Sequence, residues 1–184
     1  HYSLPHSIGR ALHQLQCTKV THTIDLGCGT GLCGIVLREL SEQLTGIDIS
    51  TKMLAQAKNK AIYDELIEAE LISFLQKDTT PYDMAVAADV LPYLGELGPL
   101  FSGIHQRLNN QGLFIFTHEI STDDPWTLQD TSRFSHHPDY IHSLCSQYDF
   151  KILFQENIIA RHQQNQELHV MLYVVQINPR NIDG

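Results

Sequence analysis

The sequence predicts an α/β protein with a doubly wound, mostly parallel sheet of seven strands, in which the last strand is antiparallel. Predicted strands and helices alternate from the first strand onward, which favours a parallel sheet with helices on both faces. A glycine-rich loop at residues 27–31 joins the first strand to a helix. Two predicted strands close the chain, Lys151–Ile159 and Glu167–Ile177. Only the short polar run Arg161–Gln166 joins them, which implies an antiparallel edge of the sheet.

Apolar spacing and turn residues define the elements of the first half of the chain. Leu32, Val36 and Leu40 share one face of a helix that the glycine loop opens. Ser50 is a good N-cap for the next helix, because its hydroxyl can accept a hydrogen bond from the first turn. The expected helices are His6–Leu15, Gly31–Leu40 and Thr51–Ala61, and the expected strands are about Thr21–Leu26, Gln43–Ile49 and Leu66–Glu70.

The second half of the chain continues this alternation. Asp83–Ala88 is almost wholly apolar, as expected of a parallel strand that is buried on both faces. Ser121–Arg133 is rich in Ser, Thr, Asp and Pro and is predicted to be a loop. The other expected elements are a short helix over Ile72–Gln76, a helix over Leu97–Leu108, a strand over Leu113–Glu119 and a helix over Pro138–Gln147.

The glycine loop and an acid after it predict a pocket for a nucleoside cofactor. The loop reads Asp25-Leu26-Gly27-Cys28-Gly29-Thr30-Gly31, and Asp48 lies at the tip of the next strand, seventeen residues beyond Gly31. Glycine has no Cβ, so the backbone can approach a ligand closely. A carboxylate at a strand tip can accept hydrogen bonds from both ribose hydroxyls.

Two kinds of cofactor fit such a pocket, and Asp25 discriminates between them. Gly29, Gly31 and Gly34 also match the spacing of dinucleotide-binding loops. A pyrophosphate is held by the amides of that loop, and a carboxylate aimed at the same place would repel it. S-adenosylmethionine has no phosphate and carries an ammonium and a sulfonium. Residues 25–31 and Gly46-Ile47-Asp48-Ile49-Ser50 resemble the first two motifs of class I S-adenosylmethionine-dependent methyltransferases.

This resemblance implies a Rossmann-like methyltransferase fold, with S-adenosylmethionine as cofactor and S-adenosylhomocysteine as product. It implies that the loop glycines line the methionine portion, that Asp48 holds the ribose, and that Ala88 and Asp89 lie next to the sulfonium. Met53 also fits a core position, and Glu70 also fits a solvated strand end. The residues implied to bind the cofactor are Asp25, Gly27, Cys28, Gly29, Gly31, Leu32, Asp48, Ile49, Met53, Glu70, Leu71, Ala88 and Asp89.

Further segments are similar to a bacterial subfamily of predicted methyltransferases associated with tetratricopeptide repeats. These segments are Thr30–Gly34, Tyr63–Leu66, Tyr82–Leu97 and Ser132–His136 with Tyr140. No 34-residue helical repeat is present in the 184 residues, so we expect such repeats to lie upstream of His1 or to be absent. The subfamily implies no particular substrate.

Composition narrows the class of partner and the location. The chain has 21 acidic and 12 basic residues, a formal charge of −9, which disfavours nucleic acid as a partner. We expect one domain over residues 1–184, in which residues 1–20 form a leading helical segment that is a possible lid, with Tyr2. The four cysteines are expected to be reduced thiols, and the chain to be cytoplasmic without membrane contact. His136-His137 is expected to be a solvated pair rather than part of a metal site.

Three side chains at strand ends are candidates for the chemistry: Asp89, His118 and Glu119. A base is needed only when the methyl acceptor starts protonated. His118 alternates with Phe114 and Phe116 and therefore also fits a position beneath a helix, whereas Asp89 fits a cofactor contact better than a base. The catalytic base itself stays unassigned.

The expected function is methyl transfer to an unidentified acceptor, a small molecule by preference. Enzymes that methylate amides or exocyclic amines often carry Asn/Asp-Pro-Pro-Tyr after the fourth strand. Here that place reads Asp89-Val90-Leu91-Pro92-Tyr93, which argues against such acceptors. A protein-directed methyltransferase with an upstream repeat region or a protein partner remains open. So does a scaffold domain that binds the cofactor without catalysis.

Overall fold

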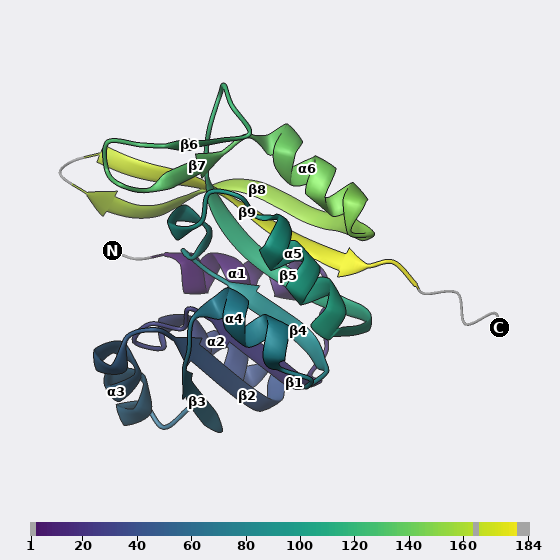
Figure 1. Cartoon of the computed structure of the whole chain (residues 1–184). Helices are drawn as coiled ribbons and strands as arrows, with labels where there is room; N and C mark the ends of the chain where they lie inside the picture. Colours follow the sequence, from purple (N-terminus) through teal and green to yellow (C-terminus); the bar gives the residue numbers. More distant parts are fainter. Residues whose placement is uncertain (1–2, 164–165, 180–184) are drawn as a thin grey trace.

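The computed structural model describes residues 3–163 and 166–179 and shows one large twisted sheet with helices on both faces (Figure 1). Its main path begins with the parallel strands β3-β2-β1-β4-β5. It continues through β9, which is antiparallel to β5, and β8, which is antiparallel to β9. The strands of this path are β1 (Val20–Leu26), β2 (Ser41–Asp48), β3 (Glu65–Glu68), β4 (Tyr82–Ala87), β5 (Leu108–Ile120), β8 (Phe150–Gln163) and β9 (Gln166–Ile177). These seven strands confirm the predicted fold class.

Two short strands extend the sheet beyond the seven, so that nine are found among the described residues. They are β6 (Trp126–Leu128) and β7 (Phe134–His136), which form an antiparallel hairpin. β7 pairs in parallel with the end of β5. The prediction of a loop throughout Ser121–Arg133 was therefore wrong, because strands of three residues carry too little alternation to be recognised from sequence.

The helices lie where the alternation predicted them. They are α1 (Leu4–Gln14), α2 (Leu32–Glu39), α3 (Thr51–Asn59), α4 (Leu71–Lys77), α5 (Gly98–Arg107) and α6 (Pro138–Gln147), with a single 3₁₀ turn, η1 (Leu91–Tyr93), after β4. α6 has the predicted bounds. The Ser50 hydroxyl accepts a hydrogen bond from the N–H of Met53, as expected of an N-cap.

Most strands differ from the prediction by one or two residues at an end, and β5 and β8 differ by more. β3 ends at Glu68 rather than Glu70, because Glu70 caps α4 instead. β5 begins five residues earlier than expected, at Leu108, which pairs with Tyr82 before an irregularity in the register. β8 continues to Gln163, so that the polar run at residues 161–166 lies largely within the hairpin strands.

The two faces of the sheet bury separate apolar cores, as period-2 alternation requires. On one face, α4, α5 and α6 cover side chains such as Ile24, Phe114 and Tyr173. On the other face, α1 and α2 cover Met84, Ile115 and Leu172, among others. The leading helix α1 is thus part of a core: its Leu4, Ile8 and Leu12 are fully buried. Tyr2 lies outside the described residues.

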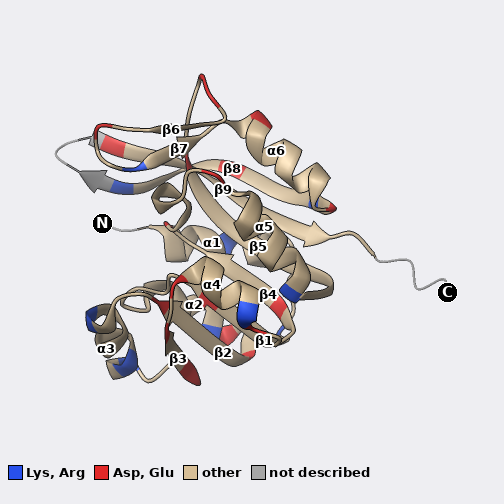
Figure 2. Cartoon of the chain, viewed as in Figure 1, with Lys and Arg blue, Asp and Glu red and all other residues tan. Residues whose placement is uncertain are grey.

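Charged side chains are distributed over many elements (Figure 2). Lys and Arg appear on α3 and α4 and at scattered places elsewhere, and the described part of the chain shows no single basic stripe. Within residues 3–163 and 166–179, none of the helices has the length and apolar character that crossing a membrane requires.

His118 lies in the core rather than at the surface. Its side chain is fully buried, stacks on Tyr173 at 5.6 Å between ring centroids, and approaches the ring of His136 at 6.2 Å. Nδ1 lies 3.0 Å from the carbonyl oxygen of Glu119, and Nε2 has no hydrogen-bond partner among the described residues. Burial therefore lowers the pKa of His118 to about 4.

This buried histidine predicts a loss of stability in acid. The unfolded chain binds a proton at His118 below about pH 6.5, whereas the folded chain binds it only near pH 4, so stability falls as the pH drops through this window. Replacing His118 by Phe keeps the stacked ring and removes the titration. We expect the free energy of unfolding of His118→Phe to gain about 2–3 kcal/mol relative to the wild type between pH 7 and pH 4.5. Urea unfolding of both proteins at each pH measures this. Equal changes in their free energies of unfolding over this pH range would contradict the prediction.

Candidate cofactor site

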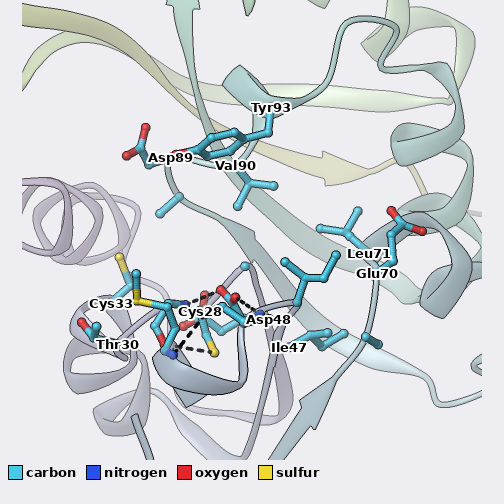
Figure 3. Close-up of a pocket in the computed structure, with 18 of the residues that line it drawn as sticks. Cys28, Thr30, Cys33, Ile47, Asp48, Glu70, Leu71, Asp89, Val90 and Tyr93 are labelled. Carbon is cyan, nitrogen blue, oxygen red and sulfur yellow. Dashed lines mark hydrogen bonds between the residues drawn. The ribbon is translucent and has the colours of Figure 1, made fainter. Parts of the chain in front are cut away.

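A cavity of about 650 Å³ opens at the carboxyl ends of β1, β2 and β4 (Figure 3). The predicted cofactor residues line it, with the exception of Gly31. Further lining residues from the glycine loop, α2, β2 and its following turn were not predicted: Thr30, Cys33, Ile47 and Ser50. The other unpredicted ones follow β3 and β4: Ala69, Val90, Tyr93 and Leu94.

The glycine loop needs glycine for its backbone conformation and, at Gly27 and Gly31, also for space. Gly27, Gly29 and Gly31 have φ values of +65°, +55° and +82°, which residues with a Cβ adopt only under strain. A Cβ on Gly27 would lie 2.5 Å from Cγ2 of Val90, which lines the cavity across from the loop. A Cβ on Gly29 would meet nothing within 4 Å.

Asp48 ties the glycine loop to the loop after β2. One carboxylate oxygen accepts from the N–H of Gly29 at 2.9 Å and the other from the N–H of Ser50 at 2.8 Å. An ionised carboxylate offers about four acceptor positions on its two oxygens, so both remain able to accept from a ligand's hydroxyl groups. Asp48 therefore shapes the cavity and also presents acceptors to it.

Large apolar side chains are exposed around the same cavity. Leu32, Ile49, Met53 and Tyr93 are 43%, 70%, 42% and 67% exposed, and all four line it. Exposed apolar groups gathered at a concave site are typical of a ligand-binding site. Figure 3 shows Glu70 and Leu71 on one side of the cavity and Tyr93 with Val90 on another.

The charged residues that line the cavity, within the described chain, are all acidic: Asp25, Asp48, Glu70 and Asp89. Both carboxylate oxygens of Glu70 accept from N–H groups of α4, those of Ile72 and Ser73. These hydrogen bonds lower the pKa of Glu70. A cation is thus favoured in the cavity and an anion is disfavoured.

Asp25 is buried at the end of β1, where it lines the cavity with only 1% of its surface exposed. Burial, joined by the charge of Asp48, raises its pKa to about 7, while a hydrogen bond from the Tyr63 hydroxyl at 2.6 Å acts in the opposite direction. Gly31 does not reach the cavity, because a Cβ on it would point at the Tyr63 ring, 2.9 Å away.

Asp89 lies at the end of β4 in a strained conformation that several contacts maintain. Its φ is +55°, and its N–H donates to the Thr117 hydroxyl at 3.1 Å. Its carboxylate pairs with Arg133, and Arg161 lies 3.6 Å from it. A strained residue held by its surroundings is common at functional sites.

Arg133 links Asp89 to Glu119, the other acidic residue among the candidates for the chemistry. Its Nε donates to Glu119 at 2.6 Å, and its guanidinium lies 5.2 Å from the centre of the Tyr93 ring. Of the three candidates for chemistry, Asp89 lines the cavity, whereas Glu119 and the buried His118 do not.

The aromatic residues after β5 meet at the β6–β7 hairpin. The Trp126 and Tyr140 rings lie 5.2 Å apart, beside Gly95, whose missing Cβ leaves room for Trp126 and Phe134. His136 is fully buried, with Nε2 at 2.9 Å from the carbonyl oxygens of both Leu94 and Gly95. The expectation of a solvated His136-His137 pair was therefore wrong for His136.

Cys28 and Cys33 line the cavity as thiols. Burial raises the pKa of both, and the charge of Asp25 raises it further. None of the four cysteines forms a disulfide, and no cluster of three metal-ligating side chains occurs in the described ranges.

The arrangement of the strands is that of a known fold. The sheet order and the antiparallel last strands are those of the Rossmann-like methyltransferase fold. Residues 24–114 match the family described as Methyltransferase domain. The matched segment contains the glycine loop, Asp48 and Asp89, and solved structures of this fold hold S-adenosylmethionine or S-adenosylhomocysteine.

Two curated proteins are similar to about 60% of this chain. A carboxy-S-adenosyl-L-methionine synthase from Campylobacter concisus is 32% identical over 111 residues, which cover 58% of this chain and 47% of the relative. A malonyl-[acyl-carrier protein] O-methyltransferase from Salmonella typhimurium is 27% identical over 112 residues, 61% of this chain and 44% of that protein. The chain thus matches less than half the length of either relative.

The fold is also that of a magnesium protoporphyrin IX methyltransferase from Synechocystis PCC 6803, solved with S-adenosylmethionine bound. The TM-score is 0.72 at 17% identity, over 96% of this chain and 79% of that one. At this identity the likeness concerns the fold alone.

Sequence reasoning did not assign Tyr63 and Arg133 to the site. Tyr63 and Arg133 lie in connecting segments, and no spacing rule connects them to Asp25 or Asp89. Only the folded chain brings these pairs together.

The glycine loop yields a stability prediction. Gly27→Ala adds the cost of a positive φ and a clash with Val90, whereas Gly29→Ala adds only the former. We expect Gly27→Ala to be less stable than Gly29→Ala by about 1–3 kcal/mol in denaturant unfolding. The double variant with Val90→Ala should recover most of this difference. Equal stability of the two single variants would contradict it.

Proposed function

We propose that this chain transfers a methyl group from S-adenosylmethionine to a small-molecule acceptor. The observation that supports the cofactor most directly is the all-acidic charge of the cavity lining. Acidic groups attract the ammonium and sulfonium of S-adenosylmethionine and repel the pyrophosphate of a dinucleotide. Asp48 is proposed to accept from the ribose hydroxyls, and the exposed Ile49 and Met53 to cover the adenine.

The acceptor is proposed to carry a nucleophilic atom that needs no protein base. Among the described residues, the cavity lining includes no histidine or lysine, and the Asp89 carboxylate is engaged by two arginines. A carboxylate oxygen that already accepts from an arginine has less capacity left to accept a proton from a substrate. A carboxylate fits this arrangement because it presents a lone pair at neutral pH, as does the unprotonated fraction of a thiol or an amine.

Small molecules are favoured over macromolecules as acceptors. The site is a cavity of about 650 Å³, and the basic residues of the described chain are scattered (Figure 2). A protein-directed activity is the nearest alternative, and one relative's name includes an acyl-carrier protein. We also propose that residues 1–184 act as one domain, because both cores combine elements from the two halves of the chain.

We also propose that the chain belongs to the methyltransferases associated with tetratricopeptide repeats. It is supported by the segment Tyr82–Leu97, which supplies η1, and by Ser132–His136, which supplies Arg133. These segments meet at the Arg133 pairs with Asp89 and Tyr93.

Calorimetry with S-adenosylmethionine tests the cofactor assignment through Asp48→Ala. Loss of two hydrogen bonds to a charged acceptor should weaken binding at least about 100-fold. Asp139→Ala is the matched control, because Asp139 on α6 is 88% exposed and lines no part of the cavity. Unchanged affinity in Asp48→Ala would refute the ribose assignment, and binding of NAD(P) in place of S-adenosylmethionine would refute the cofactor.

Turnover distinguishes an enzyme from a scaffold. Methyl-labelled S-adenosylmethionine should yield S-adenosylhomocysteine with one class from a panel of small carboxylates, thiols and amines. If the wild type binds S-adenosylmethionine yet transfers methyl to no compound or carrier protein in the panel, the scaffold alternative is favoured instead.

A further inference from the structure

Three glycines from separate segments form a slot that holds the ring of Tyr63. A Cβ on Gly31 would lie 2.9 Å from Cε2 of Tyr63, one on Gly34 would lie 2.3 Å from its hydroxyl oxygen, and one on Gly46 would lie 2.8 Å from Cε1. These glycines belong to the glycine loop, α2 and β2, respectively. Any other residue at these places would displace the ring, so the slot fixes where the hydroxyl lies.

The hydroxyl is directed at the buried carboxylate of the cavity. Tyr63 donates to Oδ2 of Asp25 at 2.6 Å. Burial and the charge of Asp25 raise the pKa of Tyr63, which therefore remains a donor at all ordinary pH values. Gly31 and Gly34, which match a dinucleotide-binding spacing in the sequence, thus serve this tyrosine in the structure.

We propose that Tyr63 is a positioning residue for S-adenosylmethionine, whose hydroxyl holds Asp25 as the oriented, ionised carboxylate that attracts the ammonium of the cofactor's amino-acid end. The proposal rests on the proposed function, because it concerns the same cavity. Asp48 is assigned to the ribose, and Asp25 lies on the adjacent strand at the base of the glycine loop, where the methionine portion is expected.

The proposal implies a pH dependence of binding. The groups that face Asp25 are Tyr63, Asp48 on β2, Cys28 in the loop and Cys33 on α2, and the two thiols remain protonated because their pKa values are raised. The pKa of Asp25 is about 7, so the carboxylate becomes neutral as the pH falls below that value. Affinity for a cationic ligand should fall with it.

The test compares the wild type with Tyr63→Phe, which keeps the ring in the slot and removes the donor. Without the donor the pKa of Asp25 rises. As the pH falls, the variant therefore loses affinity at a higher pH than the wild type does. We expect Tyr63→Phe to bind S-adenosylhomocysteine about tenfold more weakly than the wild type at pH 6. The two affinities should converge by pH 8.5. The ratio of the two affinities does not depend on the titration of the ligand's own amine, because that titration affects both proteins equally.

Two controls separate this role from a structural one. Tyr82→Phe removes a buried hydroxyl at the start of β4, at the other end of the strands, and should bind like the wild type at every pH. 5′-Methylthioadenosine keeps the nucleoside and sulfur but lacks the amino-acid end. For this ligand the ratio of wild type to Tyr63→Phe should stay near one across the pH range.

The other outcomes would contradict either the role of Tyr63 or the proposed function. A ratio for S-adenosylhomocysteine that is the same at all pH values overturns the proposal, whether it equals one or reflects general damage to the site. A pH-dependent ratio with S-adenosylmethionine but not with S-adenosylhomocysteine would assign Asp25 to the sulfonium and overturn the ammonium assignment. Absence of binding by the wild type at every pH would instead contradict the proposed function, and the role of Tyr63 with it.

Discussion

The cavity depends on the bridge that Asp48 makes between two backbone loops. Its carboxylate accepts from Gly29 on one side and Ser50 on the other, so the two loops that follow β1 and β2 keep a fixed separation. The adjacent Cys28 N–H donates to the carbonyl of Ile47 and adds a second tie between the same segments. These hydrogen bonds join the two segments that form adjoining parts of the cavity wall.

A second set of contacts organises the other wall. Arg133 comes from the hairpin after β5, yet it pairs with Asp89 after β4 and with Glu119 in β5. Its guanidinium also lies against the exposed ring of Tyr93. One side chain thus connects three segments that are far apart along the chain. The hairpin, whose first strand lies in a segment predicted only as a loop, is held beside the cavity by this network and by the pairing of β7 with β5.

The sequence predicted the sheet and helices well because each rests on local periodicity. The strand–helix alternation, the Ser50 cap and the bounds of α6 all follow from neighbouring residues. Asp25 and Asp48 were predicted as parts of the cavity for the same reason, since each ends a strand. Tyr63 was not, because its place depends on glycines from three segments whose juxtaposition only folding creates. The burial of His136 likewise follows from carbonyl acceptors in a distant turn.

The acidic lining of the cavity has a consequence for exchange of the cofactor after each reaction. On methyl transfer the sulfonium becomes a neutral thioether, so the donor loses one positive charge while Asp25, Asp48 and Asp89 stay around it. The attraction that draws the donor in is therefore partly cancelled by the chemistry itself. Under the proposed function, the spent molecule is held less tightly than the fresh one, and the wall that captures the donor also favours departure of what remains of it.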